Sequence, residues 1–407
     1  FVVGLSDRRR TLTEPAFVGR TRELEQLDVQ LKNLRLGRGG VIVVETESGG
    51  GKSRLLDELT QRARCQGVWV LRGTGTSEVG LRPFQVLDGV VQEVLAAVAS
   101  EPELGARLRT QLGDRATIVA SVLPQLAAAL GCTSTEDLGP EAFAEARSVQ
   151  ALVYFIDALG AFGRPALVVL DDCQWADESA VKLIVEWSAV QEERRTPGSV
   201  VSLVSAYRTE EVPAESPLRT LPNALQLRLA KFAADDLRRL VESMAGPLPD
   251  DVVQAVVAMA DGSPFMASAV LRGLVESEAL VPEADGWRVE RLAVADLQSS
   301  QHAASFLAHR INLLPPQAAQ LLAAGAVLGK EFHWQSAVEL SGQGSYATLE
   351  LRDLARERHL LWMRSDGARC VFVHDKIRET LLARLGDDER KRLHLRAALH
   401  LRVQGNR

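Results

Sequence analysis

Three consecutive glycines followed by lysine and serine, at residues 49–53, constrain the fold of this chain more than any other feature of its sequence. The run lies shortly after an apolar segment at residues 41–44, from which ETES separates it, and it opens an amphipathic helical pattern. Successive backbone amides in such a loop can point into one concavity at a helix N-terminus, where partial positive charge favours phosphate oxygens. The pattern therefore predicts a phosphate-binding loop of the Walker A type at residues 46–53.

This loop is expected to contact the phosphates of a nucleotide through its amides and through its lysine. Lys52 would neutralise the β- and γ-phosphates, and the Ser53 hydroxyl would ligate Mg²⁺. The alternative is a plain glycine turn before a helix, with a lysine on the surface. The expected nucleotide contacts are Ser48, Gly49, Gly50, Gly51, Lys52, Ser53 and Arg54.

The loop departs from the Walker A pattern at its first position, where Thr46 replaces glycine. A β-branched residue resists a positive φ, so a strain of about 1–2 kcal/mol is expected if the backbone there requires one. Weaker nucleotide binding would follow from that strain.

A second motif, residues 165–179, is an apolar strand pattern that ends in two carboxylates, Asp171 and Asp172. An acidic strand end alone is a weak signal, but downstream of a phosphate-binding loop it becomes a strong one. Asp171 is expected to hold the Mg²⁺ shell through water, and Asp172 to point at the γ-phosphate as the catalytic base. An aspartate is one carbon–carbon bond, roughly 1.5 Å, shorter than a glutamate, so slow hydrolysis is expected.

Arg208 follows another apolar run, in the segment SAYRTEE. At the carboxyl end of a parallel sheet it would sense the γ-phosphate and take part in catalysis. The equally weighted alternative is a solvated arginine paired with Glu210 or Glu211.

Two later positions are candidates for nucleotide contacts. Pro264, in Gly-Ser-Pro, fixes a turn whose ring could press on an adenine face, or it only breaks a helix. His374, in FVHD, either caps the following helix with its aspartate neighbour or reaches the β-phosphate.

Five strands are predicted, and helical patterns separate them. Continuous rather than alternating hydrophobicity in the first, third and fourth strands indicates strands covered on both faces, whereas the fifth alternates. With helical crossovers, this predicts the fold class α/β with a parallel sheet. The segment between the second and third strands is a helical insertion that includes residues 123–130 and 151–159. The predicted strands are residues 41–44, 68–71, 166–170, 200–206 and 225–229.

The remainder of the chain divides into smaller parts. After residue 232, helices at 235–244 and 251–259 indicate a helical lid, with no strand before the C-terminal third. Helices near 305, 317, 336 and 348 and strands at 360–364 and 370–373, joined by a turn at 366–367, make a winged-helix pattern. The last helical run stops without a cap, so the natural chain is expected to continue. The predicted parts are a linker at 1–16, a nucleotide-binding domain at 17–231, the lid at 232–296, the winged helix at 297–386 and the start of a C-terminal helical region at 387–407.

Composition excludes several classes of protein. A net charge of −6 over 407 residues gives no general attraction to nucleic acid or anionic lipid, so nucleic acid is an unlikely partner. The four cysteines are far apart and form no CxxC pair. No apolar run approaches the roughly 20 residues of a membrane span, and no signal peptide precedes the first domain. A cytoplasmic location without membrane attachment is expected.

With FVGR at residues 17–20, the glycine loop, LDDCQWADES, SAYRTEE, GSPFM and FVHDKIRETLL in order, the chain resembles the STAND class of signal-transduction P-loop ATPases. This resemblance covers nearly the whole chain and implies an AAA-type ATPase module with a helical lid and a winged helix. It implies ATP or ADP with Mg²⁺ as cofactors, an effector such as a fused kinase or cyclase, and self-assembly on ATP binding. Departures from the class are Thr46 and Gln174, which stands where many relatives carry histidine.

The resemblance also assigns roles to single residues. It implies that Phe17, Val18 and Arg20 contact adenine and that Pro264 is the contact from the lid. His374 would match a histidine that reads ADP.

A nucleotide-dependent signalling switch with slow ATP hydrolysis is therefore the predicted function. Two alternatives stay open, a winged-helix DNA-binding regulator and a pseudo-ATPase scaffold. From residue 301 onward, sixteen Lys or Arg stand against eleven Asp or Glu, a mild excess that does not require phosphate binding.

Overall fold

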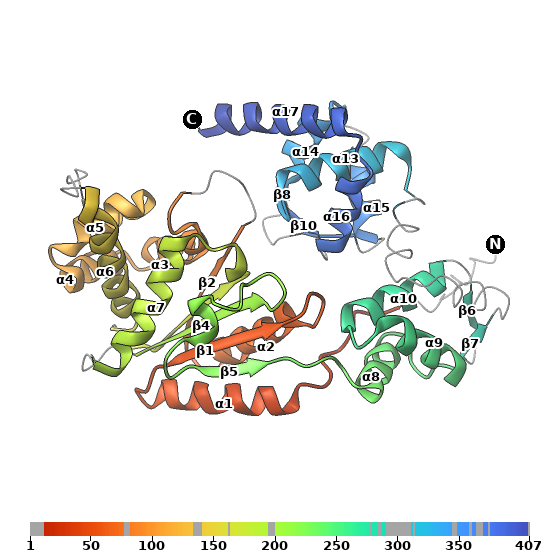
Figure 1. Ribbon diagram of the computed structural model, residues 1–407, viewed down its shortest axis with the longest axis horizontal. Helices are drawn as coiled ribbons and strands as arrows, with labels where there is room; N and C mark the ends of the chain where they lie inside the picture. Colours follow the sequence, from red (N-terminus) through yellow and green to blue (C-terminus); the bar gives the residue numbers. More distant parts are fainter. Residues whose placement is uncertain are drawn as a thin grey trace, which may run out of the picture. The chain divides into compact units, whose positions relative to one another are not determined.

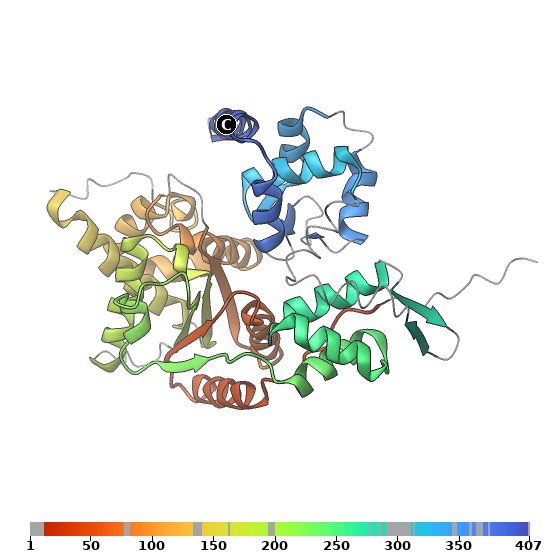
Figure 2. The same ribbon diagram turned by 45° about the vertical axis from the view of Figure 1, so that its right-hand side comes forward.

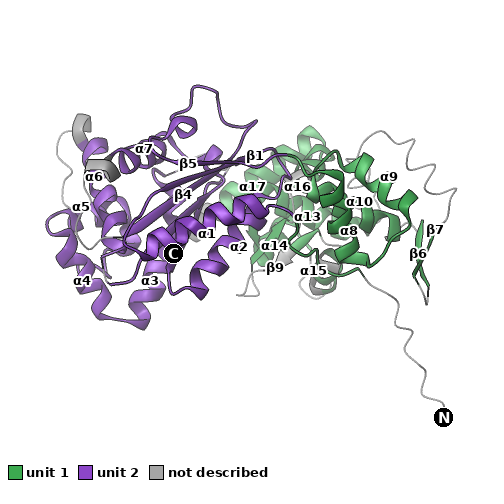
Figure 3. Ribbon diagram, turned by 90° about the horizontal axis from the view of Figure 1, so that it is seen from below, with its two compact units in different colours: residues 1–18, 231–407 green, residues 19–230 purple. Residues whose placement is uncertain are grey.

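A computed structural model describes most of the chain and divides it into two compact units (Figure 3). The sheet unit is residues 19–230, and the second unit is residues 1–18 with 231–407. The residues that the structure describes are 12–76, 82–132, 141–161, 163–193, 200–276, 279–283, 286–289, 311, 314–343, 348–357, 360–363, 369–372 and 375–405.

The sheet unit is built on a five-stranded parallel sheet with strand order β2-β3-β4-β1-β5. Every residue of β1, β3 and β4 is buried, as their continuous apolar sequences predict. The α/β prediction, with its parallel P-loop NTPase sheet, is therefore confirmed. The strands are β1 (Val41–Thr46), β2 (Trp69–Thr74), β3 (Ala166–Asp171), β4 (Val201–Arg208) and β5 (Leu225–Arg228).

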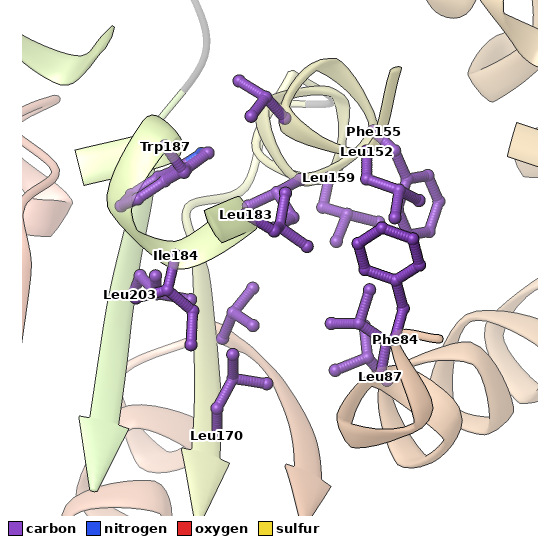
Figure 4. Packing of buried hydrophobic residues seen from close by; sticks show 14 of the residues in the cluster. Phe84, Leu87, Leu152, Phe155, Leu159, Leu170, Leu183, Ile184, Trp187 and Leu203 are labelled. Atoms are coloured by element: carbon purple, nitrogen blue, oxygen red, sulfur yellow. The ribbon is translucent and has the colours of Figure 1, made fainter. Parts of the chain in front are cut away.

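Helices cover both faces of this sheet (Figure 1). Helix α2 (Lys52–Cys65) packs on β1, β2, β3 and on α1 (Thr21–Arg35). The opposite face carries the larger core, in which α6 (Glu141–Leu159) and α7 (Glu178–Glu193) meet the strands. Figure 4 shows Leu183, Ile184 and Trp187 of α7 above the strands, with Phe84 and Phe155 meeting beside them.

The insertion between β2 and β3 is helical, as predicted, but one part of it differs. Residues 123–130 form only a short 3-10 turn, Pro124–Leu126, followed by irregular turns. Leu123 has φ −120° and ψ 77° because a residue before proline is excluded from the helical region. The other helices here are η1 (Gln85–Leu87), α3 (Asp88–Ser100), α4 (Glu103–Leu112) and α5 (Arg115–Val122).

In the second unit, three helices share one apolar core (Figure 2). They are α8 (Ala234–Ala245), α9 (Asp250–Ala260) and α10 (Pro264–Glu276), which confirms the two helices predicted at 235–244 and 251–259; their role as a lid remains a prediction. The extended chain before the sheet unit also lies on α8, since the Thr13 amide donates to the Met244 carbonyl over 2.9 Å.

A two-stranded hairpin follows these helices, where no strand was predicted. It pairs β6 (Leu280–Glu283) with β7 (Gly286–Val289), and both strands fall within residues 232–296, which were predicted as the helical lid. Buried Trp287 holds the hairpin in the lid core by donating its indole N–H to the Ala245 carbonyl over 2.9 Å. Strands of four residues are too short to show an alternating pattern.

The C-terminal part combines helices with a three-stranded antiparallel sheet of order β8-β10-β9. The sequence predicted two of these strands and missed the three-residue β8. Its order of elements is the one that motivates the winged-helix prediction, which remains a prediction; the helix expected near 305 and the turn at 366–367 lie outside the described residues. The elements are α13 (Pro316–Leu328), β8 (Glu331–His333), α14 (Trp334–Ser341), α15 (Thr348–Glu357), β9 (Leu361–Met363), β10 (Arg369–Phe372), α16 (Asp375–Ala383) and α17 (Asp387–Gly405).

In the described part of the chain, no helix combines the length and apolar character needed to cross a lipid bilayer.

Candidate nucleotide-binding site

The glycine loop connects β1 to α2 in the conformation that its sequence predicts. Gly49 and Gly51 have φ values of 80° and 91°, in the left-handed region that favours glycine. At Gly50 a Cβ would lie 2.1 Å from the Thr46 hydroxyl, so no side chain fits there. Gly49 and Gly51 are thus favoured by their backbone conformation, and Gly50 by the space that the Thr46 side chain occupies.

Thr46 does not carry the strain expected at the first loop position. It is the last residue of β1 and has no positive φ, so the strain argument is wrong. Its side chain is buried and donates a hydrogen bond to the Leu229 carbonyl over 3.2 Å. The strand ends one residue later than the motif suggests, and the left-handed turns fall further along the loop.

Lys52 lies at the start of α2 and forms ion pairs with both predicted acids. Its Nζ contacts Asp171 Oδ1 directly and lies 2.9 Å from Asp172 Oδ1. Burial lowers the pKa of Lys52, but the two carboxylates outweigh it, so this pKa is raised above its usual value. The ammonium group is therefore charged and held by the acids at the end of β3.

Asp172 is fixed by its backbone and by two neighbours. Its φ of 51° is left-handed, which aspartate tolerates better than most residues, and its amide donates to Asp171 Oδ1 over 2.8 Å. Gln174 donates from Nε2 to Asp172 Oδ1 over 3.1 Å and accepts from the Arg208 amide over 3.2 Å. The amide side chain thus links the acidic turn after β3 to the end of β4.

Arg208 ends β4 and lies opposite Thr46 in the strand register. Its guanidinium is 2.9 Å from Glu211 and 4.0 Å from Asp172 Oδ1, and it lies over the Trp175 ring at 5.4 Å from the centroid. The side chain is only 9% exposed, so the solvated alternative is wrong although the pairing with Glu211 is present. A buried cation beside the acids can respond to charge in the glycine loop.

Glu210 was singled out only as a possible partner of Arg208, yet it contacts the loop itself. Its Oε1 accepts a hydrogen bond from the Ser48 amide over 2.7 Å. The only sequence signal was its place two residues after the end of β4, which lies beside β1.

Arg20 supports the loop from its other side. Its Nη2 donates to the Gly50 carbonyl over 3.0 Å and to the Ala230 carbonyl over 2.7 Å. Its side chain is 8% exposed. The structure therefore brings Arg20 to the predicted site, through the loop backbone.

The other predicted residues lie in α2, in the second unit or outside the described residues. Ser53 and Arg54 lie exposed in the first turn of α2. Phe17 and Val18 belong to the second unit, where Val18 packs against the lid core. Pro264, also in the second unit, is the first residue of α10, and His374 lies outside the described residues.

Residues present in the sheet unit fit an adenine nucleotide with Mg²⁺. The Ser48 amide already binds an anionic oxygen, which shows that the loop can donate to one. Lys52 offers a buried cation, and the hydroxyl of Ser53 and carboxylate of Asp171 are the hard oxygen ligands that Mg²⁺ prefers.

Comparison with known proteins agrees with this geometry. Residues 16–204 match the family model of the AAA ATPase domain. Together with the five-stranded parallel sheet and the glycine loop, this match defines an AAA-type P-loop ATPase module, a class that binds ATP or ADP.

Three individual proteins illustrate how far the similarity extends. An uncharacterised protein of Rhizobium meliloti is 26% identical over 184 residues, which cover 42% of this chain and 17% of that protein. The solved STAND protein with a tetratricopeptide repeat sensor from Pyrococcus horikoshii aligns with a TM-score of 0.52 and 15% identity, over 98% of this chain and 47% of its own. Cdc6p of Pyrobaculum aerophilum aligns with a TM-score of 0.41 and 14% identity, over 91% of this chain and 96% of its own.

The chain spans less than a fifth of the first relative and about half of the second. At 15% identity, the solved STAND structure shows similarity of fold alone.

Proposed function

We propose that this chain is the nucleotide-controlled switch of a STAND-type regulatory protein. ADP holds the ATPase domain, the helical lid and the winged helix together, and exchange for ATP opens them for assembly with other copies. Slow hydrolysis then resets the closed state. The effector, such as a fused kinase or cyclase, is linked to this module.

The observation that carries the proposal is the buried cluster of Lys52, Asp171 and Asp172. These are the groups that would bind phosphate, hold Mg²⁺ and orient water, and here they bind one another. A nucleotide must separate Lys52 from the acids before each group can reach its ligand. The same residues therefore have two stable sets of partners, as a switch requires.

Individual roles follow from this exchange. The loop amides, Lys52 and Arg54 would hold the phosphates, and Ser53 with Asp171 would hold Mg²⁺, which neutralises phosphate charge when bound. Asp172 would accept a proton from the attacking water, but it is one bond shorter than the glutamate of fast ATPases. Arg208, beside Asp172, would report the γ-phosphate to the loop after β4.

The remaining proposed roles concern the adenine base and the recognition of ADP. Phe17, Val18, Arg20 and Pro264 would contact adenine, and His374 would hold the β-phosphate of ADP. The contact of Arg20 with the Gly50 carbonyl supports a place for Arg20 beside the nucleotide. Similarity in fold to a STAND protein with a repeat sensor supports the class.

Nucleotide analysis of the purified protein tests the switch. We expect the wild-type protein to retain ADP and to release phosphate at well below one per second. In calorimetry, Lys52→Ala should weaken the free energy of ATP binding by a few kcal/mol. Retained ATP with no turnover would favour a pseudo-ATPase, and unchanged ATP affinity in folded Lys52→Ala would refute the loop assignment.

A second candidate, DNA binding, is favoured by the β8-β10-β9 sheet packed with α13 to α16. The mild excess of basic residues in this part would give weak, salt-dependent binding. Fluorescence anisotropy with duplex DNA at 50 and 200 mM salt tests it, and a dissociation constant below 1 µM at the higher salt would favour this role.

A further inference from the structure

The loop that follows β4 is held firmly against the sheet by Arg219. This side chain donates to the carbonyls of Thr209 over 2.5 Å and Val212 over 2.6 Å. The other terminal nitrogen of the same guanidinium group, Nη1, lies 3.6 Å from the carboxylate of Glu45, a buried residue of β1. The loop thus has a defined conformation set by a buried acid in the sheet.

The same loop is joined directly to the phosphate-binding loop. The Thr209 amide donates to the Thr46 carbonyl over 3.0 Å, and the next residue, Glu210, accepts from the Ser48 amide over 2.7 Å. Anchoring at Thr209 and by Arg219 therefore places the Glu210 carboxylate on a backbone donor of the glycine loop. Arg208, which directly precedes Thr209, is paired with Glu211.

We propose that Glu210 is a specificity-determining residue that makes the site favour nucleoside diphosphates over triphosphates. This inference rests on the proposed function of residues 46–53 as the phosphate site. A carboxylate on a loop amide occupies a position where an anion binds, and its charge opposes each phosphate that enters. ATP carries about one more negative charge than ADP near the loop, so the opposition is greater for ATP.

The exposure of Glu210 limits the size of this charge effect and makes it depend on salt, which allows it to be recognised. Its side chain is exposed, so dissolved salt screens its charge, and the discrimination must weaken as ionic strength rises. A merely structural hydrogen bond would affect both nucleotides equally and would respond little to salt.

A neutral isostere separates charge from structure. Glu210→Gln keeps the side-chain length and an oxygen that can accept from the Ser48 amide, and removes only the charge. Glu215→Gln is the matched control, because Glu215 is exposed on the same loop and, within the described residues, has no hydrogen bond to residues 46–53.

Calorimetry with ADP and a non-hydrolysable ATP analogue, each with Mg²⁺, tests the proposal at 50 and 300 mM NaCl. At low salt, Glu210→Gln should raise affinity for the analogue about tenfold and for ADP about threefold, with a smaller difference at high salt. Glu215→Gln should change either affinity less than twofold.

Equal changes for both nucleotides, or a Glu215→Gln effect as large as that of Glu210→Gln, would overturn the inference. A folded wild-type protein that binds neither nucleotide would overturn the proposed function, and this inference with it. Wild-type binding with unchanged affinities in Glu210→Gln would overturn the inference alone.

Discussion

Lys52→Ala removes the ammonium group that the two acids at the end of β3 share. Asp171 and Asp172 are 6% and 2% exposed, so the variant leaves two carboxylates buried without their main partner. Breaking a buried ion pair costs about 3–5 kcal/mol, and the nearby Arg208 favours the lower end. For a unit of this size, about 3 kcal/mol lowers the Tm by roughly 6–12 °C.

The dependence on pH distinguishes this cause from a simple loss of packing. The raised pKa of Lys52 means that its stabilisation is fully present below its unfolded pKa of 10.5 and is lost only at more alkaline pH. In Lys52→Ala, two buried carboxylates remain side by side without the cation, and their repulsion is relieved when one of them binds a proton. The folded variant then binds protons more tightly than the unfolded chain, so its stability falls as pH rises from 5 to 8.

Thermal unfolding without nucleotide, followed by circular dichroism at pH 5 and pH 8, measures both effects. Arg54→Ala, at an exposed position two residues along α2, is the matched control and should change stability by less than about 0.5 kcal/mol. A Lys52→Ala penalty that is the same at both pH values would refute the buried-charge argument. So would a penalty no larger than that of the control.

Three further substitutions test separate parts of the site. Asp171→Asn should weaken Mg²⁺-dependent nucleotide binding about tenfold in calorimetry, whereas Asp172→Asn should leave binding intact and slow phosphate release about 10²-fold or more; equal loss of binding in both variants would contradict these roles. Gln174→Ala should lower kcat about tenfold with less than a threefold change in ATP affinity, because it only orients Asp172; an unchanged kcat would refute that role. Thr46→Gly should lower the unfolding free energy by about 1 kcal/mol through loss of the bond to the Leu229 carbonyl, without raising ATP affinity; a higher affinity would show that the loop is strained after all.

The parallel sheet could be predicted from sequence because its signals are local. Strands β1, β3 and β4 are continuous apolar runs, and their bounds differ from the predicted ones by at most two residues. Burial on both faces makes such runs apolar at every position. The hairpin of β6 and β7 and the three-residue β8 gave no such signal, because they are short and depend on contacts distant in sequence. Trp287 of β7 donates to the Ala245 carbonyl, and β8 pairs with β10.

At the site, the motifs predicted which residues lie close together but not which of them bind one another. Lys52 and Asp171 are 119 residues apart, and Ser48 and Glu210 are 162 apart, so no periodicity connects them. Strand order brings them together, because β4 lies between β3 and β1 and all three end at the same edge. The strand order alone would therefore predict that Glu210 lies beside the glycine loop.

The site also explains why residues predicted to bind a nucleotide contact one another here. A lysine and two acids chosen to bind a phosphate chain and Mg²⁺ carry opposite charges, and burial makes each of them costly to leave unpaired. Without a nucleotide they satisfy one another, as Lys52 does with Asp171 and Asp172. A nucleotide therefore competes with an existing set of ion pairs, and its contacts with the loop, Lys52 and the acids must offset the cost of breaking that set.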